Sequence, residues 1–118
     1  MKKITSLDVY NLSEELSDRI WVLYDKWSGK AQNTMGYQII RSADSIAANI
    51  AEGYGRKTTR QYIYGLYLAN GSLCELETQL MLSQDLGYCD SKDFKSLKNR
   101  IDEISRMLRA LIKALEPL

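Results

Sequence analysis

Apolar residues recur along the chain at steps of three and four positions, the spacing that gathers them on one face of an α-helix. The clearest run lies in the last quarter of the chain and alternates strictly between the two steps: Phe94, Leu97, Ile101, Ile104, Leu108, Leu111 and Leu115. Asp90 stands just before it and is a suitable helix N-cap. We therefore predict a helix over about 91–115.

Three earlier runs show the same spacing and predict helices over about 8–28, 34–53 and 59–86. Their apolar positions are Leu12, Leu16, Ile20, Leu23 and Trp27; then Ile39, Ala43, Ile46 and Ile50; then Tyr62, Leu66, Ala69, Leu73, Leu76 and Leu80. No strand-type alternation competes with them. Short connectors between successive helices favour antiparallel neighbours, so the predicted fold is all-α, an up-down-up-down four-helix bundle in a single domain over 1–118.

Glycines and caps mark the expected helix ends. Ser28-Gly29-Lys30 should break the first helix, and Gly53 and Gly55 should end the second by supplying left-handed backbone positions. Thr58-Thr59-Arg60-Gln61 has the form of a capping box, and Gly87 is expected to end the third helix. Two glycines inside that helix, Gly65 and Gly71, each cost about 1 kcal/mol relative to alanine, which predicts close backbone packing against a neighbour.

Composition narrows the function classes. The 118 residues are 45% hydrophobic and 26% charged, enough apolar material for a folded core. The chain contains no histidine, which removes Ser-His-Asp and Cys-His catalysis, His-ligated zinc and the Glu-x-x-His sites of di-iron bundles. Glu75 and Glu77 are two positions apart and point to different helix faces, so they do not form a catalytic carboxylate pair. We expect no enzyme activity, no cofactor and no metal.

The distribution of charge and the two cysteines bear on the partners and the cellular location expected for the protein. Net charge is +1, but residues 61–90 contain no Lys or Arg and residues 91–118 contain seven, an uneven distribution that suits self-association or a charged partner and also arises between solvated faces. If the intervening chain is helical, Cys74 and Cys89 lie on the order of 20 Å apart, beyond disulfide reach. Free thiols favour a cytoplasmic location, and the broken apolar runs predict no membrane span.

A polar stripe on the predicted 34–53 helix lies nearly opposite its apolar seam. Arg41, Ser45 and Glu52 share this stripe, with Asn49 on its flank. The small residues Ala47, Ala48 and Ala51 lie between them and permit close approach of another backbone. An ordinary solvated face is one explanation, and a subunit interface is the one we prefer.

The predicted 59–86 helix carries a second polar set. Ser72, Glu75 and Gln79 share a face, and Glu77 lies on another flank. Arg41 or Arg56 has the charge to pair with Glu75 or Glu77, and the sequence leaves these pairings open.

The connection between the second and third predicted helices is the best candidate for contact with nucleic acid. Arg56, Lys57 and Arg60 are interleaved with Tyr54 and Tyr64 beside a helix N-terminus, a combination suited to phosphates and bases. The same residues are also typical caps and solubilising charges. The basic residues of the last helix form a second candidate surface, which acidic residues dilute.

Two sequence blocks resemble a known family. Ser45-Ile46-Ala47-Ala48-Asn49-Ile50-Ala51-Glu52-Gly53 and Gly71-Ser72-Leu73-Cys74-Glu75-Leu76-Glu77 are similar to the S-I-x-x-N-I-A-E-G and G-S-x-x-E-L-E patterns of the bacterial four-helix-bundle proteins encoded in intervening sequences of 23S rRNA genes. Two positions depart from the family: Ala47 stands where proline is common, and Asp44 where an apolar residue is usual.

The resemblance implies a ring-like homopentamer with no established enzymatic activity. It also implies that Arg41, Ser45, Asn49, Glu52, Ser72, Glu75 and Glu77 organise packing and the subunit interface. A related branch, the accessory variability determinant proteins of diversity-generating retroelements, works with nucleic acid through a basic surface. We therefore expect a non-catalytic homo-oligomeric scaffold, possessing protein partners, and keep as the alternative an accessory protein that binds RNA or DNA.

Overall fold

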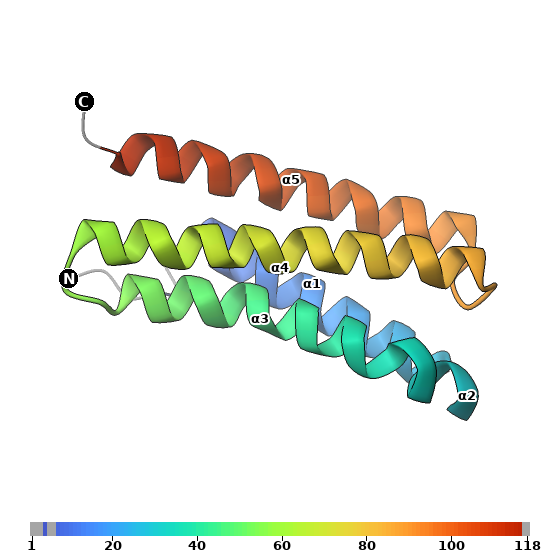
Figure 1. Ribbon diagram of the computed structural model, residues 1–118. Helices are drawn as coiled ribbons and strands as arrows, with labels where there is room; N and C mark the ends of the chain where they lie inside the picture. The colour runs from blue at the N-terminus through green and yellow to red at the C-terminus, as the bar shows by residue number, and fades with distance from the viewer. Residues whose placement is uncertain (1–3, 5–6, 117–118) are drawn as a thin grey trace.

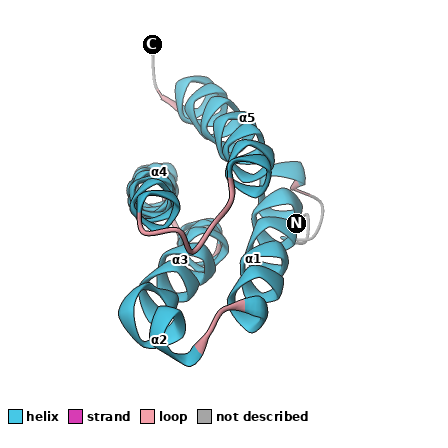
Figure 2. Cartoon of the chain, turned by 90° about the vertical axis from the view of Figure 1, so that its right-hand side faces the viewer, coloured by secondary structure: helices cyan, strands magenta, loops and turns pink. Residues whose placement is uncertain are grey.

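The computed structural model describes residue 4 and residues 7–116, and over these residues the chain is helical and contains no strand. Four long helices run antiparallel to their neighbours along the chain: α1 (Asp8–Lys26), α3 (Tyr37–Tyr54), α4 (Thr59–Asp85) and α5 (Ser91–Leu115) (Figure 1). They form a rod-like bundle of 47 × 21 × 19 Å. Seen end-on, α3 lies between α1 and α4, and α5 closes the bundle against α4 and α1 (Figure 2). The predicted all-α bundle is confirmed.

The core follows the predicted apolar seams. Its fully buried large side chains come from all four long helices: Leu16, Ile20, Ile39, Ile46, Ile50, Leu66, Leu73, Leu76, Leu80, Ile104 and Leu108. Ile112 is also buried, although the predicted seam passes through Leu111, which is only partly buried. In the described part of the chain, no helix has both the length and the apolar character needed to cross a membrane.

The second helical segment begins earlier than predicted. It starts at Gly29 rather than near residue 34, because Ser28 accepts a hydrogen bond from the backbone N–H of Ala31 at 3.2 Å and caps a new helix. The short α2 (Gly29–Ala31) passes through a π-helical turn, η2 (Gln32–Gly36), into α3. A Cβ at Gly36 would lie 2.5 Å from Cε2 of Tyr24, so this position admits only glycine without movement of the tyrosine ring.

The expected role of Gly53 and Gly55 as left-handed helix terminators is wrong. Gly53 lies inside α3, Gly55 has a φ of −79°, and the only positive φ in the described residues belongs to Gly87. Gly53 instead packs closely against α4, where a Cβ on Gly65 would lie 2.8 Å from Cα of Gly53. Close backbone packing is thus confirmed for Gly65. A Cβ on Gly71 would meet no atom within 4 Å, so nothing in the described chain packs against it.

The first helix ends at Lys26 rather than near residue 28, but both ends of α4 and the start of α5 match the sequence prediction. Thr58 accepts a hydrogen bond from the N–H of Gln61 at 3.1 Å, and Asp90 accepts one from the N–H of Asp93 at 2.7 Å. Gly87, with φ of 81°, turns the chain after α4. These local signals fix the connections that place α3, α4 and α5 side by side.

Candidate functional site

Within the described residues, α4 and its C-cap carry several large apolar side chains that remain exposed. Six such side chains are 42–65% exposed, with Leu86 at the C-cap and Tyr67 donating a hydrogen bond to Glu116: Tyr64, Tyr67, Leu68, Met81, Leu82 and Leu86. At about 100° per residue, Tyr64, Leu68, Leu82 and Leu86 share one stripe with Gly71 and Glu75. We use the name α4 outer stripe for the residues on this one line: Tyr64, Leu68, Gly71, Glu75, Leu82 and Leu86. Its leucines are absent from the predicted interface residues, although the lack of any charge from Gln61 to Cys74 is a signal that marks them.

The neighbouring outer face of α3 carries polar side chains. Arg41 and Glu52 are exposed, and Ser45 and Asn49 are half-buried, as the sequence pattern predicts for a face opposite the core. The Ser45 hydroxyl donates to the carbonyl of Arg41 at 2.7 Å, and the Asn49 amide donates to the carbonyl of Ser45 at 2.8 Å. Both side chains therefore bond to their own helix and project little beyond the surface of α3.

A groove of about 240 Å³ lies between the end of α3 and the start of α4. It brings together residues from both predicted sets, since Asn49, Glu52, Arg56 and Tyr64 all line it, with Leu68 at one end. Nη2 of Arg56 lies 2.6 Å from Oε1 of Glu52, and both side chains are more than half exposed. Such an exposed pair adds little stability, but it partly neutralises the positive charge predicted to meet phosphate.

The other residues predicted to contact nucleic acid differ in their exposure to solvent. Lys57 and Arg60 are exposed at the turn between α3 and α4, and Tyr64 is 65% exposed on the outer stripe. Tyr54 is half-buried and packs edge-on against Tyr62, with ring centroids 5.6 Å apart. Burial, followed by the neighbouring Tyr54, raises the pKa of Tyr62 above its usual value. Tyr54 therefore contributes to packing, whereas the other residues remain on the surface.

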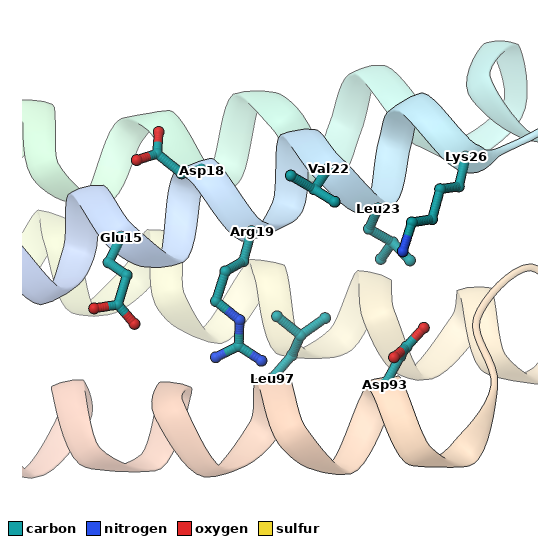
Figure 3. A pocket seen from close by; sticks show the side chains of 8 residues that line it. All are labelled: Glu15, Asp18, Arg19, Val22, Leu23, Lys26, Asp93 and Leu97. Atoms are coloured by element: carbon teal, nitrogen blue, oxygen red, sulfur yellow. The ribbon is translucent and has the colours of Figure 1, made fainter.

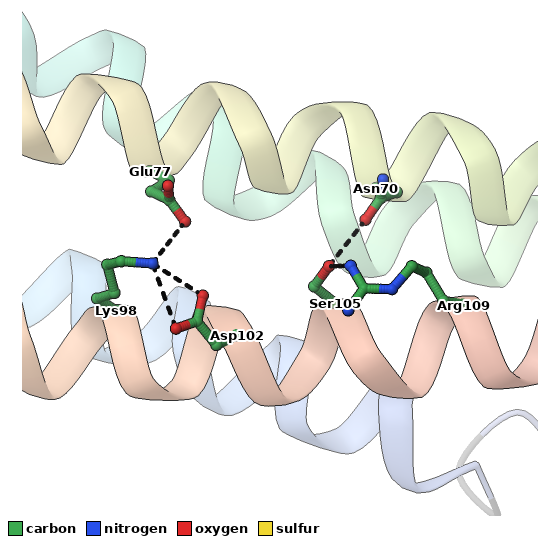
Figure 4. A network of polar contacts seen from close by, with 6 residues as sticks. All are labelled: Asn70, Glu77, Lys98, Asp102, Ser105 and Arg109. Atoms are coloured by element: carbon green, nitrogen blue, oxygen red, sulfur yellow. Dashed lines mark hydrogen bonds and ion pairs between the residues drawn. The ribbon is translucent and has the colours of Figure 1, made fainter.

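Glu77 belongs to a polar network between α4 and α5 (Figure 4). Nζ of Lys98 lies 3.0 Å from Oδ1 of Asp102 and 3.4 Å from Oε1 of Glu77. Hydrogen bonding to Asp102 is the largest of the influences that raise the pKa of Lys98. Of the four pairings that the sequence left open, none occurs within the described chain, because Arg56 pairs with Glu52 and Glu77 with Lys98.

Ser72 and Glu75 lie on the solvent side of α4. Ser72 is half-buried and Glu75 is exposed. Neither Glu75 nor Arg41 belongs to any of the ion pairs in the described residues. Two of the predicted interface charges are therefore left on the outer face of the α3–α4 hairpin without an intrachain salt bridge.

A second groove, of about 290 Å³, separates α1 from α5 (Figure 3). Val22, Leu23 and Leu97 give it an apolar lining, and its charged residues are of both signs: Glu15, Asp18, Arg19, Lys26 and Asp93. Some of these charged side chains already have polar partners within the chain. Arg19 donates to Oγ of Ser96 at 2.6 Å, and Arg100 reaches Glu15 at 2.9 Å. This groove is held together by its own polar contacts, unlike the bare surface of α4.

Asp44, one of the two departures from the family pattern, ties α3 to α1. Its Oδ1 accepts hydrogen bonds from the hydroxyl of Ser17 and, at 3.3 Å, from Nε1 of Trp21. The carboxylate thus fixes a tryptophan that is 44% exposed. This contact is not predictable from the sequence, because the three residues are brought together only by helix packing.

The two thiols differ in environment, and both are free, as predicted. Cys74 is exposed on α4, whereas Cys89 is 3% exposed in the α4–α5 connection. Burial, with smaller contributions from Asp93 and Asp90, raises the pKa of Cys89 to about 11. Within the described residues, no three Cys, Asp or Glu side chains gather in a way that could hold a metal ion.

The described residues form a small antiparallel four-helix bundle with large apolar side chains exposed on α4. Residues 5–110 match the 23S rRNA-intervening sequence protein family, and the chain belongs to that family. A crystal structure of a protein of unknown function from the S23 ribosomal protein family of Bacteroides thetaiotaomicron VPI-5482 is similar, with 31% identity and a TM-score of 0.79. The match covers 89% of this chain and 98% of that one. No curated protein matches the chain.

Proposed function

We propose that this protein is a non-catalytic helical scaffold that assembles into a homo-oligomer through the outer face of the α3–α4 hairpin. The uncovered apolar surface of α4 carries this proposal, because monomeric proteins rarely leave so many large apolar side chains together in water. Leu68 and Leu82 are 42% and 48% exposed on a helix that has no Lys or Arg after Arg60. Covering them with a second copy removes this apolar area from water.

A cyclic pentamer is the assembly we propose, on the strength of the family resemblance. A ring suits a molecule whose α3 and α4 surfaces differ, because unlike surfaces pair head to tail and close on rotation. The scaffold would present the basic outer side of α5 to its protein partners. Free thiols, one of them exposed, support a cytoplasmic setting.

Light scattering coupled to size-exclusion chromatography at micromolar concentration tests the proposal. The expected mass is five times the 13.5 kDa of one chain. Replacing Leu68 by Lys places a charge in the proposed interface and should shift the mass towards that of one chain. Ala110→Lys, at an exposed position of α5, is the matched control and should leave the mass unchanged. A monomeric wild-type protein would rule out the scaffold.

A second candidate is a nucleic-acid-binding accessory protein that acts with RNA or a ribonucleoprotein, like the related accessory variability determinant proteins. The exposed Lys57 and Arg60 beside Tyr64 favour it. Fluorescence anisotropy with a structured RNA and a duplex DNA should then show affinity that falls log-linearly with salt. Changing Arg56, Lys57 and Arg60 together to Glu should abolish binding while the helical circular dichroism signal persists. Binding that survives this change would exclude the hairpin surface.

A further inference from the structure

Arg41 and Glu75 are the two charges at the middle of the hairpin's outer face, and the intrachain ion pairs leave both unmatched. Among the other charges considered for this face, Arg56 pairs with Glu52 and Glu77 with Lys98. No ion pair in the described residues includes Arg41 or Glu75, and both side chains are exposed. One positive and one negative group are thus free to meet a second copy of the chain.

The register of α3 against α4 shows that these two charges lie at the same height in the bundle. Gly65 of α4 packs between Asn49 and Gly53 of α3. Towards the other end, Gln38 shares a groove with α4 residues from Cys74 to Leu82. Because the helices are antiparallel and rise equally per residue, each step forward on α3 matches a step back on α4. Arg41 is therefore level with Glu75.

The same register sets small residues of α3 opposite the middle of the α4 outer stripe. It places Leu68 level with Ala48, and Gly71 level with Ser45. Gly71 has no atom of its own chain within 4 Å of a Cβ, so intrachain packing does not explain a glycine at this helical position. Ser45 folds its hydroxyl back onto α3 at 2.7 Å, which leaves room beside it. The α4 outer stripe and the α3 face are complementary in size as well as in charge.

Cyclic symmetry carries this register from one chain to the next. In a ring whose axis runs parallel to the bundle, rotation moves a copy sideways without changing its height, so α3 of the next copy lies level with α3 of the first. An α4 that faces that neighbour meets residues at the heights set by its own hairpin. We propose, resting on the oligomer proposed above, that the α4 outer stripe packs on α3 of the next copy and that Glu75 pairs there with Arg41.

Charge reversal and charge exchange test this interface. Arg41→Glu and Glu75→Arg should each weaken association at least about tenfold, because each places like charges together at the contact. The double variant Arg41→Glu/Glu75→Arg exchanges the two charges at every interface and should recover the wild-type mass. Sedimentation velocity over a concentration series measures all three, with circular dichroism to verify that each variant is helical.

The controls separate the interface from the assembly itself. Arg106→Glu makes the same charge change on the exposed side of α5 and should leave association unchanged. An oligomeric wild type whose mass is insensitive to both single reversals would overturn this interface while the scaffold stands. Single reversals that lower the melting temperature at constant mass would show that the pair forms within one chain, and would also overturn it. A monomeric wild type would remove both proposals.

Discussion

The inner and outer faces of α4 are both apolar, but only the inner face is covered. Leu66, Leu73, Leu76 and Leu80 are at most 1% exposed against the other helices. On the outer face Leu68 and Leu82 remain nearly half exposed. The adjacent α5 has the same buried seam, yet its outer surface carries exposed Lys92, Lys95, Arg106 and Lys113. The two helices therefore differ on their outer sides: α5 presents charged side chains to solvent, whereas α4 leaves large apolar side chains exposed.

The largest expected effect separates an inner leucine from an outer one. Leu73→Ala leaves a cavity in the core and should lower the free energy of unfolding by about 2–5 kcal/mol. Leu82→Ala removes the same atoms from an uncovered surface, so the fold of a single chain should lose less than about 0.5 kcal/mol. Urea denaturation monitored by circular dichroism measures both.

Protein concentration sharpens this first comparison. Loss of the outer leucine should act on association, so the Leu82→Ala midpoint should depend on concentration differently from the wild type. The Leu73→Ala loss should persist at every concentration. Equal losses for the two variants at low concentration would show that the two faces do not differ.

A smaller effect is expected from the two glycines of α4. A Cβ at Gly65 would lie 2.8 Å from both Cα of Gly53 and the carbonyl oxygen of Asn49, which are backbone atoms that cannot step aside. Gly65→Ala should therefore cost about 1–3 kcal/mol, the range of an overpacked core. Gly71→Ala meets no atom of its own chain, and in a single chain should stabilise the helix by up to about 1 kcal/mol. Thermal melts of both variants give the comparison, and a stabilised Gly65→Ala would contradict the close approach of α3 and α4.

Local periodicity predicts the four helices because the apolar residues of each helix lie within one continuous stretch of the chain. The start at Gly29 is not predicted because Ser28-Gly29-Lys30 has the composition of a helix break, whereas Ser28 caps a new helix there. Gly53 was assigned to a helix end because its actual neighbour, Gly65, is visible only once two helices are paired. Sequence thus gives the faces, whereas the register between helices needs the structure.

The candidate site shows the same division. The polar stripe of α3 was predicted and lies on the outside, as expected from its spacing. The outer leucines of α4 were missed because a single seam was assigned to each helix, and α4 has two. The partners of Arg56 and Glu77 lie four residues away and on another helix, respectively, and charge alone does not choose among such options.

The smallest expected effect concerns the two thiols, of which Cys89 is buried and Cys74 is exposed. The pKa of Cys89 is raised to about 11 in the folded protein, against about 9 unfolded, because burial disfavours the thiolate. As pH rises above 9 the unfolded chain loses this proton and the folded chain keeps it, so stability should fall by about 1 kcal/mol between pH 9 and 10. Urea titrations of the wild type and Cys89→Ala at both values isolate this contribution, because the variant lacks it. Cys74, being exposed, should react with a maleimide at pH 7.5 while Cys89 does not, and equal labelling of both thiols in the folded protein would contradict the burial that sets this pKa.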